Sequence, residues 1–325
     1  MTTTNSAPVL PEPKLKLVSV AEPVTGVIVS NDSCIRGKLA SFVRHTAIDI
    51  SGTPLENNCL VGQAFGVMAP GEDEQGKPHK VRLYSLACPS SGEDGSGKVI
   101  STTTKRVIDE CTPQQSGDDA ENHRLFLGVC SNYLCDLRPG DEVKVTGPNG
   151  KRFLFPVNTN EHDYLFVATG TGIAPFRGMI MELLVRPAEP CTSQIHLIMG
   201  TPYTTDLIYD DLFARLAAEH DNFHYHTAIS RETQADGGRG LYVHHLLDQR
   251  IDEFSPLLGD PRTLVYICGL AGMQSGIFQS LARHGLADGY FTTKSPLAET
   301  NPDDWDLQQV RRAVRSTERC MVEVY

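Results

Sequence analysis

Several features are scarce or missing in this 325-residue sequence, and each absence narrows its possible functions. There is no run of about 18 apolar residues, so we expect no membrane span. Residues 1–20 contain no arginine and no basic segment followed by an apolar one, which argues against a secretory signal and an organelle transit peptide. Positive charge is in deficit, with 29 Lys and Arg against 40 Asp and Glu, and the net charge of −11 disfavours nucleic acid as the main partner.

Cysteine is present, but not in a pattern that builds a covalent or metal framework. The nine cysteines form no Cys-x-x-Cys pair, so the sequence contains no iron–sulfur ligand set and no sign of a disulfide framework. Free and mostly buried thiols in a reducing compartment are the simplest interpretation. We therefore expect a cytoplasmic protein without a bound metal.

The composition is that of an ordinary folded protein, with 40% hydrophobic and 21% charged residues, and the length suggests two domains. Residues 1–15 are polar and proline-containing, and we expect them to be a disordered tail. Over residues 16–157, short β-like runs alternate with turn sequences, which predicts an antiparallel β-barrel or sandwich. From 158 to 325, apolar runs alternate with helical patterns, which predicts a doubly wound parallel α/β sheet.

The first candidate site is the expected strand Lys80–Leu86, in which polar and apolar residues alternate. Side chains two apart in a strand point the same way, so Arg82 and Tyr84 share one face, and Ser85 follows directly. A cation beside an aromatic ring suits a ligand that is both flat and anionic, such as a flavin nucleotide. Taken alone, the pattern fits an ordinary exposed strand face better.

Two turns have the composition of phosphate-binding sites. In Gly128–Leu134, Ser131 or Asn132 is expected to cap a short helix whose first N–H groups would accept a phosphate, although an ordinary capped turn is the simpler interpretation. The apolar run Tyr164–Ala168 is followed by Thr169–Pro175 and then by a helical pattern. This strand–turn–helix order directs backbone N–H groups and a helix dipole at a pyrophosphate.

Ligands of doubly wound sheets bind at the carboxyl ends of the strands, and several candidate residues fall there. These residues are Thr169, Gly200, Ser230 and Cys268. Farther along the chain we expect one helix over Leu246–Leu258 and a last helix over Asp303–Arg315, opened by Asn301 and Pro302.

In chain order the motifs form a collinear series. They read Arg-x-Tyr-Ser, Gly-Val-Cys-Ser-Asn-Tyr-Leu-Cys, Ala-Thr-Gly-Thr-Gly-Ile-Ala-Pro-Phe-Arg, Ser-Arg-Glu, Tyr-Ile-Cys-Gly-Leu-x-Gly-Met and a final Val-Glu-Val-Tyr. From about residue 20 to residue 325 this series resembles the plant-type ferredoxin–NADP⁺ reductases of the plastid and cyanobacterial branch. The resemblance implies an FAD-binding barrel followed by an NADP(H)-binding α/β domain.

The resemblance implies that FAD lies on the barrel, with Tyr84 against one face of the isoalloxazine and Ser85 near N5. A helix start at Gly128 would hold the flavin pyrophosphate, assisted by a basic residue. The full set implied to bind FAD is Arg82, Tyr84, Ser85, Lys105, Arg106, Gly128, Val129, Cys130, Ser131 and Tyr325.

It also implies an NADP(H) site on the α/β domain, in which Ser230 and Arg231 would bind the 2′-phosphate and Tyr242 would stack on the adenine. The family has one residue between an arginine and this tyrosine, whereas two residues separate Arg239 from Tyr242 here. We therefore expect the second phosphate cation to be shifted or lost. The implied NADP(H) residues are Thr169, Gly170, Thr171, Gly172, Ala174, Pro175, Gly200, Thr201, Ser230, Arg231, Arg239, Tyr242, Gly269, Leu270 and Met273.

The implied catalytic residues are Ser85, Cys268, Glu323 and Tyr325. Cys268 would sit beside the nicotinamide C4, in a positional role because hydride transfer needs no thiolate. Glu323 would pair with Ser85 in a hydrogen-bond relay toward N5. Tyr325 would cover the other flavin face and move aside for nicotinamide.

The implied partner is ferredoxin or flavodoxin, both acidic, docking on a local basic patch that includes Lys77 and Lys80. Two other functions stay open at this point. A reductase of the same fold could feed an oxygenase or another separate acceptor, and a non-catalytic nucleotide-binding module could have kept the fold. The presence of Ser85, Cys268, Glu323 and Tyr325 argues against the module.

Overall fold

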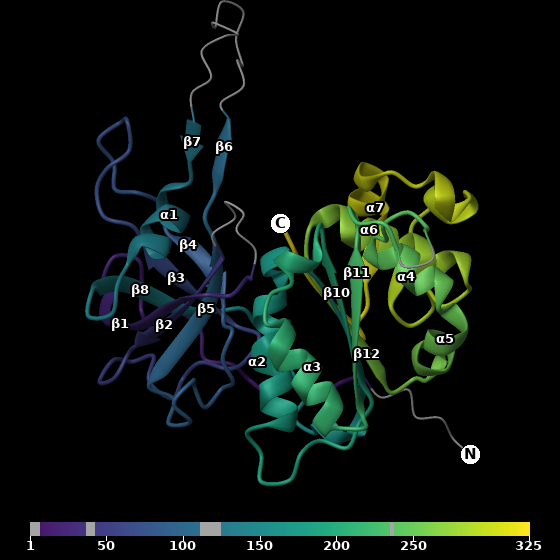
Figure 1. Cartoon of the computed structure of the whole chain (residues 1–325), viewed down its shortest axis with the longest axis horizontal. Coiled ribbons are helices and arrows are strands. Elements are labelled where there is room, and N and C mark those ends of the chain that lie inside the picture. Colours follow the sequence, from purple (N-terminus) through teal and green to yellow (C-terminus); the bar gives the residue numbers. More distant parts are fainter. Residues whose placement is uncertain (1–6, 37–42, 111–124, 235–236) are drawn as a thin grey trace, which may run out of the picture.

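The computed structural model describes residues 7–36, 43–110, 125–234 and 237–325 (Figure 1). It contains the two parts that the sequence predicts, a β-barrel and an α/β sheet, side by side.

The first part is a six-stranded antiparallel sheet in the order β4-β3-β8-β1-β2-β5. Its two outer strands meet, because the Thr102 hydroxyl donates to the Ser85 carbonyl at 2.8 Å and the Ala87 N–H donates to the Ser101 carbonyl at 2.8 Å. The sheet therefore closes on itself, which confirms the barrel. Its strands are β1 (Val24–Ser33), β2 (Val43–Asp49), β3 (Ala64–Met68), β4 (Arg82–Ser85), β5 (Val99–Lys105) and β8 (Glu142–Asn149).

Helix α1 (Val129–Asp136) covers one opening of the barrel by packing Cys130 and Leu134 into the apolar core. A small hairpin of β6 (Ile108–Glu110) and β7 (Leu125–Leu127) projects from the barrel beside it (Figure 1). This hairpin leads the chain from β5 to the start of α1.

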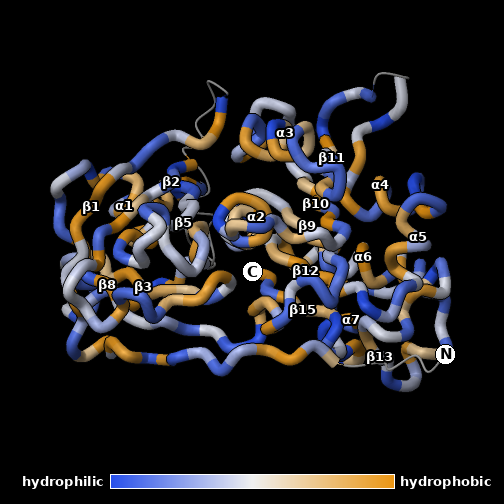
Figure 2. The backbone as a smooth tube through the Cα atoms, turned by 90° about the horizontal axis from the view of Figure 1, so that it is seen from below, coloured by the Kyte–Doolittle hydropathy of each residue, from blue (hydrophilic) through white to orange (hydrophobic). Residues whose placement is uncertain are grey.

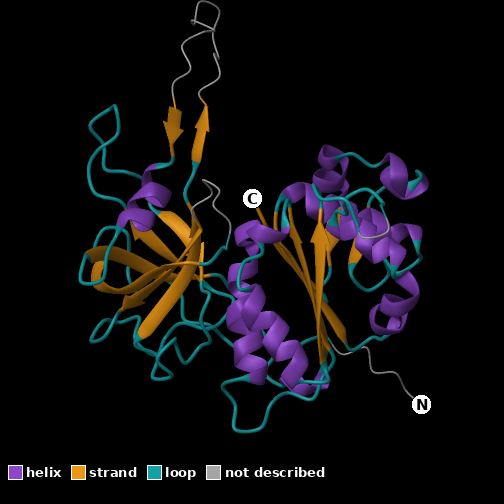
Figure 3. Cartoon of the chain, in the orientation of Figure 1, coloured by secondary structure: helices purple, strands orange, loops and turns teal. Residues whose placement is uncertain are grey.

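The second part is a five-stranded parallel sheet in the order β11-β10-β9-β12-β15. Helices cover both of its faces: α2 and α3 lie toward the barrel, and α4 to α7 lie on the far side (Figure 3). The central strands are apolar (Figure 2) because they are buried on both faces. The strands are β9 (Asp163–Thr169), β10 (Ile195–Thr201), β11 (Phe223–Ile229), β12 (Thr263–Gly269) and β15 (Cys320–Val324). The helices are α2 (Ile173–Leu184), α3 (Asp210–Glu219), α4 (Val243–Gln249), α5 (Ile251–Gly259), α6 (Ala271–Arg283) and α7 (Leu307–Ala313).

Short elements complete the chain. Strands β13 (Phe291–Thr293) and β14 (Val314–Ser316) form an antiparallel pair beyond the helices. Single 3₁₀ turns occupy Thr159–Glu161, Gly170–Gly172, Thr204–Asp206, Leu297–Glu299 and Pro302–Asp304. Among the described residues, none of the helices combines the length and apolarity needed to cross a bilayer.

The predicted helix over Leu246–Leu258 is wrong as a single element. It is two helices, α4 and α5, separated at Arg250, whose φ of −114° and ψ of 27° lie outside the helical range. The predicted last helix, Asp303–Arg315, is also too long. Asn301 caps only a 3₁₀ turn, and α7 starts at a capping box in which Asp306 and Gln309 satisfy each other's backbone N–H groups. It ends at Ala313 because the chain then joins β13 as strand β14.

The predicted cap of α1 by Ser131 or Asn132 is wrong as well. The helix begins at Val129, with Gly128 as the N-cap and no side-chain cap. Ser131 and Asn132 lie within the first turn and bond instead to the segment that follows β5: the Ser131 hydroxyl accepts from the Val107 N–H at 3.1 Å, and the Asn132 amide donates to the Val107 carbonyl at 2.9 Å.

The segment expected to be a tail is described from residue 7 onward. The Val157 N–H donates to the carbonyl of Val9 at 2.8 Å, and the Gln63 amide donates to the carbonyl of Lys14 at 3.1 Å. Residues 1–6 lie outside the described residues. The division of the chain at residues 15 and 157 stays a prediction.

Candidate functional site

Loops at the carboxyl edge of the parallel sheet meet in unusually close contact. A Cβ on Gly172 would lie 2.2 Å from the carbonyl oxygen of Cys268, and one on Gly269 would lie 2.3 Å from Oγ1 of Thr169. Gly269 also has φ of +140°, which side chains rarely allow. The Leu270 N–H donates to Oγ1 of Thr169 at 3.0 Å. The turn after β9 and the turn after β12 thus form one continuous backbone surface.

The end of the chain returns to the same surface. Strand β15 runs parallel to β12, so that Glu323 lies opposite Cys268. Tyr325 donates its N–H to the Gly269 carbonyl at 3.0 Å, and its hydroxyl pairs with that of Thr171 at 2.9 Å. Its side chain is nonetheless 64% exposed. Figures 1 and 2 show this terminus between the barrel and the sheet, so the chain ends where the two parts face each other.

Burial sets the protonation states at this edge. It raises the pKa of Glu323 to about 7, so the carboxyl is partly protonated near neutral pH. Burial, and then the neighbouring Glu323, raise the pKa of Cys268 well above its usual range. Cys268 is therefore a neutral thiol, which suits a packing role and not a nucleophilic one.

On the barrel, β4 presents the Arg-x-Tyr-Ser motif at the sheet's outer strand. Arg82 is exposed, and Tyr84 is half-buried with its ring against the barrel core. Burial raises the pKa of Tyr84 well above its usual range, with a smaller effect from the neighbouring Cys130 of α1. Ser85 is half-buried at the end of the strand. The strand therefore presents a cation and an anchored aromatic ring two residues apart, as the sequence predicts.

The start of α1 has the features of an anion site. The first helical bond runs from the Asn132 N–H to the Gly128 carbonyl at 3.0 Å, so the N–H groups of Val129, Cys130 and Ser131 precede it. The first turn contains no acidic residue and no capping side chain. N–H groups that precede the first helical bond, at the positive end of a helix, fit the phosphates of a dinucleotide.

The two basic residues implied for this site differ in their surroundings. Lys105 is exposed at the end of β5. Arg106 donates to Oδ1 of Asn132 at 2.8 Å and to Oδ1 of Asp136 at 2.5 Å, which holds its guanidinium against the side of α1. Lys105 is thus the more available of the two.

A cavity of about 850 Å³ lies beyond the end of β11. It brings together four residues implied for NADP(H): Ser230, Arg231, Arg239 and Tyr242. Arg231 and Arg239 are both exposed, so the altered spacing before Tyr242 does not remove the second arginine from the cavity. Glu232 and His245 are among the lining residues that sequence reasoning missed. The Glu232 carboxylate is engaged by the backbone and hydroxyl of Thr204, both at 2.7 Å.

The other residues implied to bind NADP(H) lie along the carboxyl edge of the parallel sheet or in the helix turns that follow it. Gly200 and Thr201 end β10, Ala174 and Pro175 are buried in the first turn of α2, and Gly170 opens the 3₁₀ turn before it. Leu270 is 58% exposed directly before α6, whereas Met273 is buried in the first turn of that helix.

Comparison with known proteins gives a consistent result. The sequence model described as "Oxidoreductase NAD-binding domain" matches residues 166–278. A ferredoxin–NADP reductase from Picosynechococcus is 38% identical over 308 residues, which cover 93% of this chain and 70% of that protein. The chloroplastic root isozyme 2 of ferredoxin–NADP reductase from Arabidopsis thaliana is 34% identical, over 97% of this chain and 77% of that protein. The chain belongs to the ferredoxin–NADP reductase family.

The fold also matches a solved structure. The ferredoxin–NADP⁺ reductase from Plasmodium falciparum superposes with a TM-score of 0.68 at 21% identity, over 95% of this chain and 98% of that one. This likeness supports the order of barrel and parallel sheet found here.

Sequence reasoning missed a polar cluster between barrel and sheet in this family member. Arg177 of α2 pairs with Glu93 of the barrel at 2.6 Å, and Glu93 also lies 3.3 Å from Nε2 of His45. The hydroxyl of Tyr209 lies 2.8 Å from Nδ1 of His45. Arg177 belongs to the Gly-Ile-Ala-Pro-Phe-Arg motif, but nothing in the sequence could pair it with a residue 84 positions earlier.

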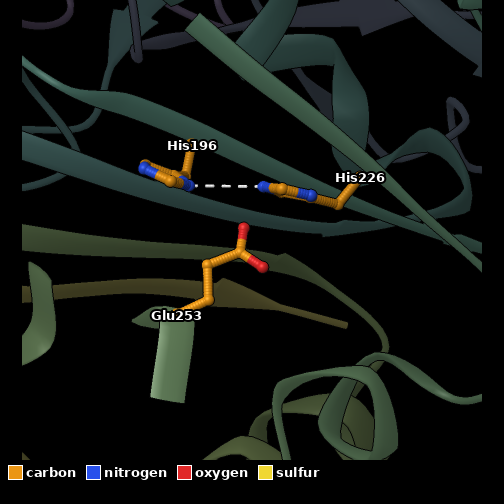
Figure 4. Close-up of side chains that lie close together, drawn as sticks. All are labelled: His196, His226 and Glu253. Atoms are coloured by element: carbon orange, nitrogen blue, oxygen red, sulfur yellow. Dashed lines mark hydrogen bonds between the residues drawn. The ribbon is translucent and has the colours of Figure 1, made fainter. Parts of the chain in front are cut away.

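A second missed cluster, His196, His226 and Glu253, places potential metal-binding atoms within 4.8 Å of one another (Figure 4). These atoms already have partners. Arg250 donates to Nδ1 of His226 at 2.8 Å and pairs with Glu253. Because arginine can only donate, His226 carries its proton on Nε2 and donates it to Nδ1 of His196 at 3.2 Å. Burial lowers the pKa of His196 to about 3 and that of His226 to about 4, so this is a neutral, internally bonded core network.

Proposed function

We propose that the protein is a ferredoxin–NADP⁺ reductase that transfers electrons between NADP(H) and ferredoxin or flavodoxin through bound FAD. The observation that carries the proposal is the meeting of Cys268, Glu323 and Tyr325 at the sheet edge that faces the barrel. Bound FAD would supply the coupling of one-electron to hydride chemistry. The helix start at Gly128, free of acidic side chains, fits its phosphates, and the ring of Tyr84 fits its flat face.

Each part of the chain would then have a separate task. Arg82 and Tyr84 orient the isoalloxazine, while the turn from Thr169 to Gly172, which contains two glycines, offers its backbone to the NADP(H) pyrophosphate. Glu323, with its pKa of about 7, holds a proton beside the reaction centre. Tyr325 covers the place where nicotinamide must enter, and its exposed ring is tied through the hydroxyl to Thr171.

We further propose that the cavity beyond β11 selects NADPH over NADH through its two arginines. A guanidinium matches the geometry of phosphate oxygens, and Arg231 and Arg239 are both exposed there. Arg231→Gln and Arg239→Gln should each raise KM for NADPH roughly tenfold, the size of one lost charge-assisted contact, with little effect on NADH. Arg312→Gln, an exposed arginine in α7, is the matched control.

The docking surface for the protein partner is proposed around Lys77 and Lys80, which are exposed in the loop before β4. The same loop carries Glu72, Asp73 and Glu74, so the patch is mixed in sign. Charge reversal at Lys80 should raise KM for ferredoxin more than KM for ferricyanide, and the difference should shrink at high salt.

We also propose a cytoplasmic location, since the eight cysteines that the structure describes are all free thiols.

The central experiment is a comparison of acceptors with purified protein. A yellow protein that oxidises NADPH much faster than NADH with ferricyanide, and reduces cytochrome c only when ferredoxin is added, would support the proposal. Rapid oxidation of NADPH without any effect of ferredoxin or flavodoxin would instead indicate a reductase for another acceptor. A colourless protein that FAD does not reconstitute would contradict the enzyme function.

A further inference from the structure

Arg177 joins the parallel sheet to the barrel through a buried ion pair. Its guanidinium makes two bonds to the Glu93 carboxylate, at 2.6 and 3.1 Å, and both side chains are less than 20% exposed. Glu93 also accepts from the Ser101 hydroxyl at 2.5 Å. The ring of Tyr209 lies beneath the guanidinium, with 5.2 Å between the carbon Cζ and the ring centroid. A charge held on several sides in this way has little freedom to move.

The pair stays ionised throughout the physiological range. Burial raises the pKa of Glu93, but the hydrogen bonds from His45 and Arg177 outweigh it and hold the pKa well below its usual value. For Arg177, burial lowers the pKa, but the bonds to Glu93 outweigh this effect and the pKa is raised overall. Removing one partner of such a pair leaves a buried charge uncompensated.

The same guanidinium also holds the backbone that follows the Arg-x-Tyr-Ser strand. Arg177 donates to the carbonyl of Ala87 at 2.7 Å, two residues after Ser85. The next residue of α2, Gly178, brings the helix so close that an added Cβ would lie 2.4 Å from the carbonyl oxygen of Cys88. Helix α2 is therefore in direct backbone contact with the segment that carries Ser85.

The other end of α2 reaches the opposite half of the site. The helix starts directly after Gly172. Gly172 lies so close to the carbonyl group of Cys268 that no side chain would fit between them. One rigid helix thus touches the Ser85 segment near its middle and the Cys268 backbone at its start. We propose that Arg177 is a positioning residue that sets the spacing between Ser85 on the barrel and Cys268 on the sheet.

This inference rests on the proposed function, since the spacing matters only where flavin and nicotinamide meet between the two parts. It assigns Arg177 a role in aligning the two rings and none in binding either cofactor. Misplacing reacting groups by about 1 Å can cost roughly a hundredfold in rate. Arg177→Lys keeps the charge but loses the planar fork that holds both Glu93 and Ala87.

The test compares wild type, Arg177→Lys and Arg186→Gln. Arg186 is the matched control because it also donates to the barrel, at the carbonyls of Gly92 and Glu93, but lies beyond the end of α2. For Arg177→Lys we expect kcat with NADPH and ferricyanide to fall ten- to hundredfold while KM for NADPH stays within twofold. For Arg186→Gln both values should stay within twofold.

Two readouts independent of turnover complete the test. The long-wavelength charge-transfer absorbance of reduced enzyme with NADP⁺ should weaken in Arg177→Lys, because it depends on ring alignment. Hydrogen exchange at the N–H groups of residues 85–88 and 178 should speed up in the same variant. A variant with an unchanged kcat and unchanged charge-transfer band, whatever its unfolding midpoint, would overturn the inference. Wild-type protein without any NADPH oxidation would instead contradict the proposed function.

Discussion

The carboxyl of Glu323 should make the protein less stable as the pH rises from 5 to 8. Its pKa is about 7 in the folded protein, against 4.5 for the unperturbed group, so the folded state holds a proton that the unfolded chain has released. Stability falls with pH wherever the folded state binds more protons. The contribution of Glu323 to the free energy of unfolding is therefore complete below pH 4.5 and is lost as the pH rises through 7.

The size of the effect follows from the shift. At about 1.36 kcal/mol per unit, the difference between 4.5 and 7 gives an upper bound of roughly 3 kcal/mol. The side chain is only half-buried, so solvent screening reduces this, and we expect about 2 kcal/mol. Glu323→Gln removes the titration and keeps the size of the side chain.

The assay is urea unfolding of the flavin-loaded protein at pH 5 and pH 8, with the free energy of unfolding extrapolated to water. From pH 5 to pH 8, the free energy of unfolding of Glu323→Gln should rise by about 2 kcal/mol relative to that of wild type. The exposed Glu318→Gln, on the same approach to β15, is the control and should show no such gain. Parallel pH profiles for wild type and Glu323→Gln would refute the reasoning.

Three further substitutions test the packing of the site and the fold. Gly172→Ala should lower NADP⁺ affinity at least tenfold in a titration, because the new methyl group would lie 2.2 Å from the Cys268 carbonyl oxygen and must force the turn apart. Gly128→Ala should speed the release of FAD, followed by fluorescence, since its Cβ would lie 2.8 Å from that of Val107 at the start of α1. Asp306→Ala should cost about 1 kcal/mol in urea unfolding by removing the capping box of α7, with NADPH oxidation unaffected.

Features that are contiguous in the sequence were predictable. The apolar run before Thr169, the glycine turn and the following helix are neighbours in the chain, so periodicity and turn residues sufficed to predict β9 and α2. The shared face of Arg82 and Tyr84 followed from strand geometry alone. The family resemblance alone implied that Cys268 and Glu323 both belong to the site, and their placement opposite each other was not predicted, because it depends on the parallel pairing of distant strands.

Features decided by tertiary contact were not predictable. The break at Arg250 depends on its bonds to His226 and Glu253, and the early end of α7 depends on strand pairing with β13. Ser131 was expected to cap α1, but its hydroxyl accepts from the backbone of Val107, a residue that sequence proximity does not suggest. In each case a long-range partner outweighed the local preference.

The contact of α2 with both halves of the molecule limits how the chain could be recombined. A chimera that keeps this barrel and replaces residues 158–325 would lose Arg177 and Gly178 together, and with them the ion pair of Glu93 with Arg177 and the fit against Cys88. If the whole second domain is exchanged to change coenzyme preference, the barrel and the new sheet should therefore be misaligned unless Arg177 and Gly178 are retained. Evolution of coenzyme choice in this architecture has an easier route through the loops beyond β11, because the cavity there is lined by none of the residues that join α2 to the barrel.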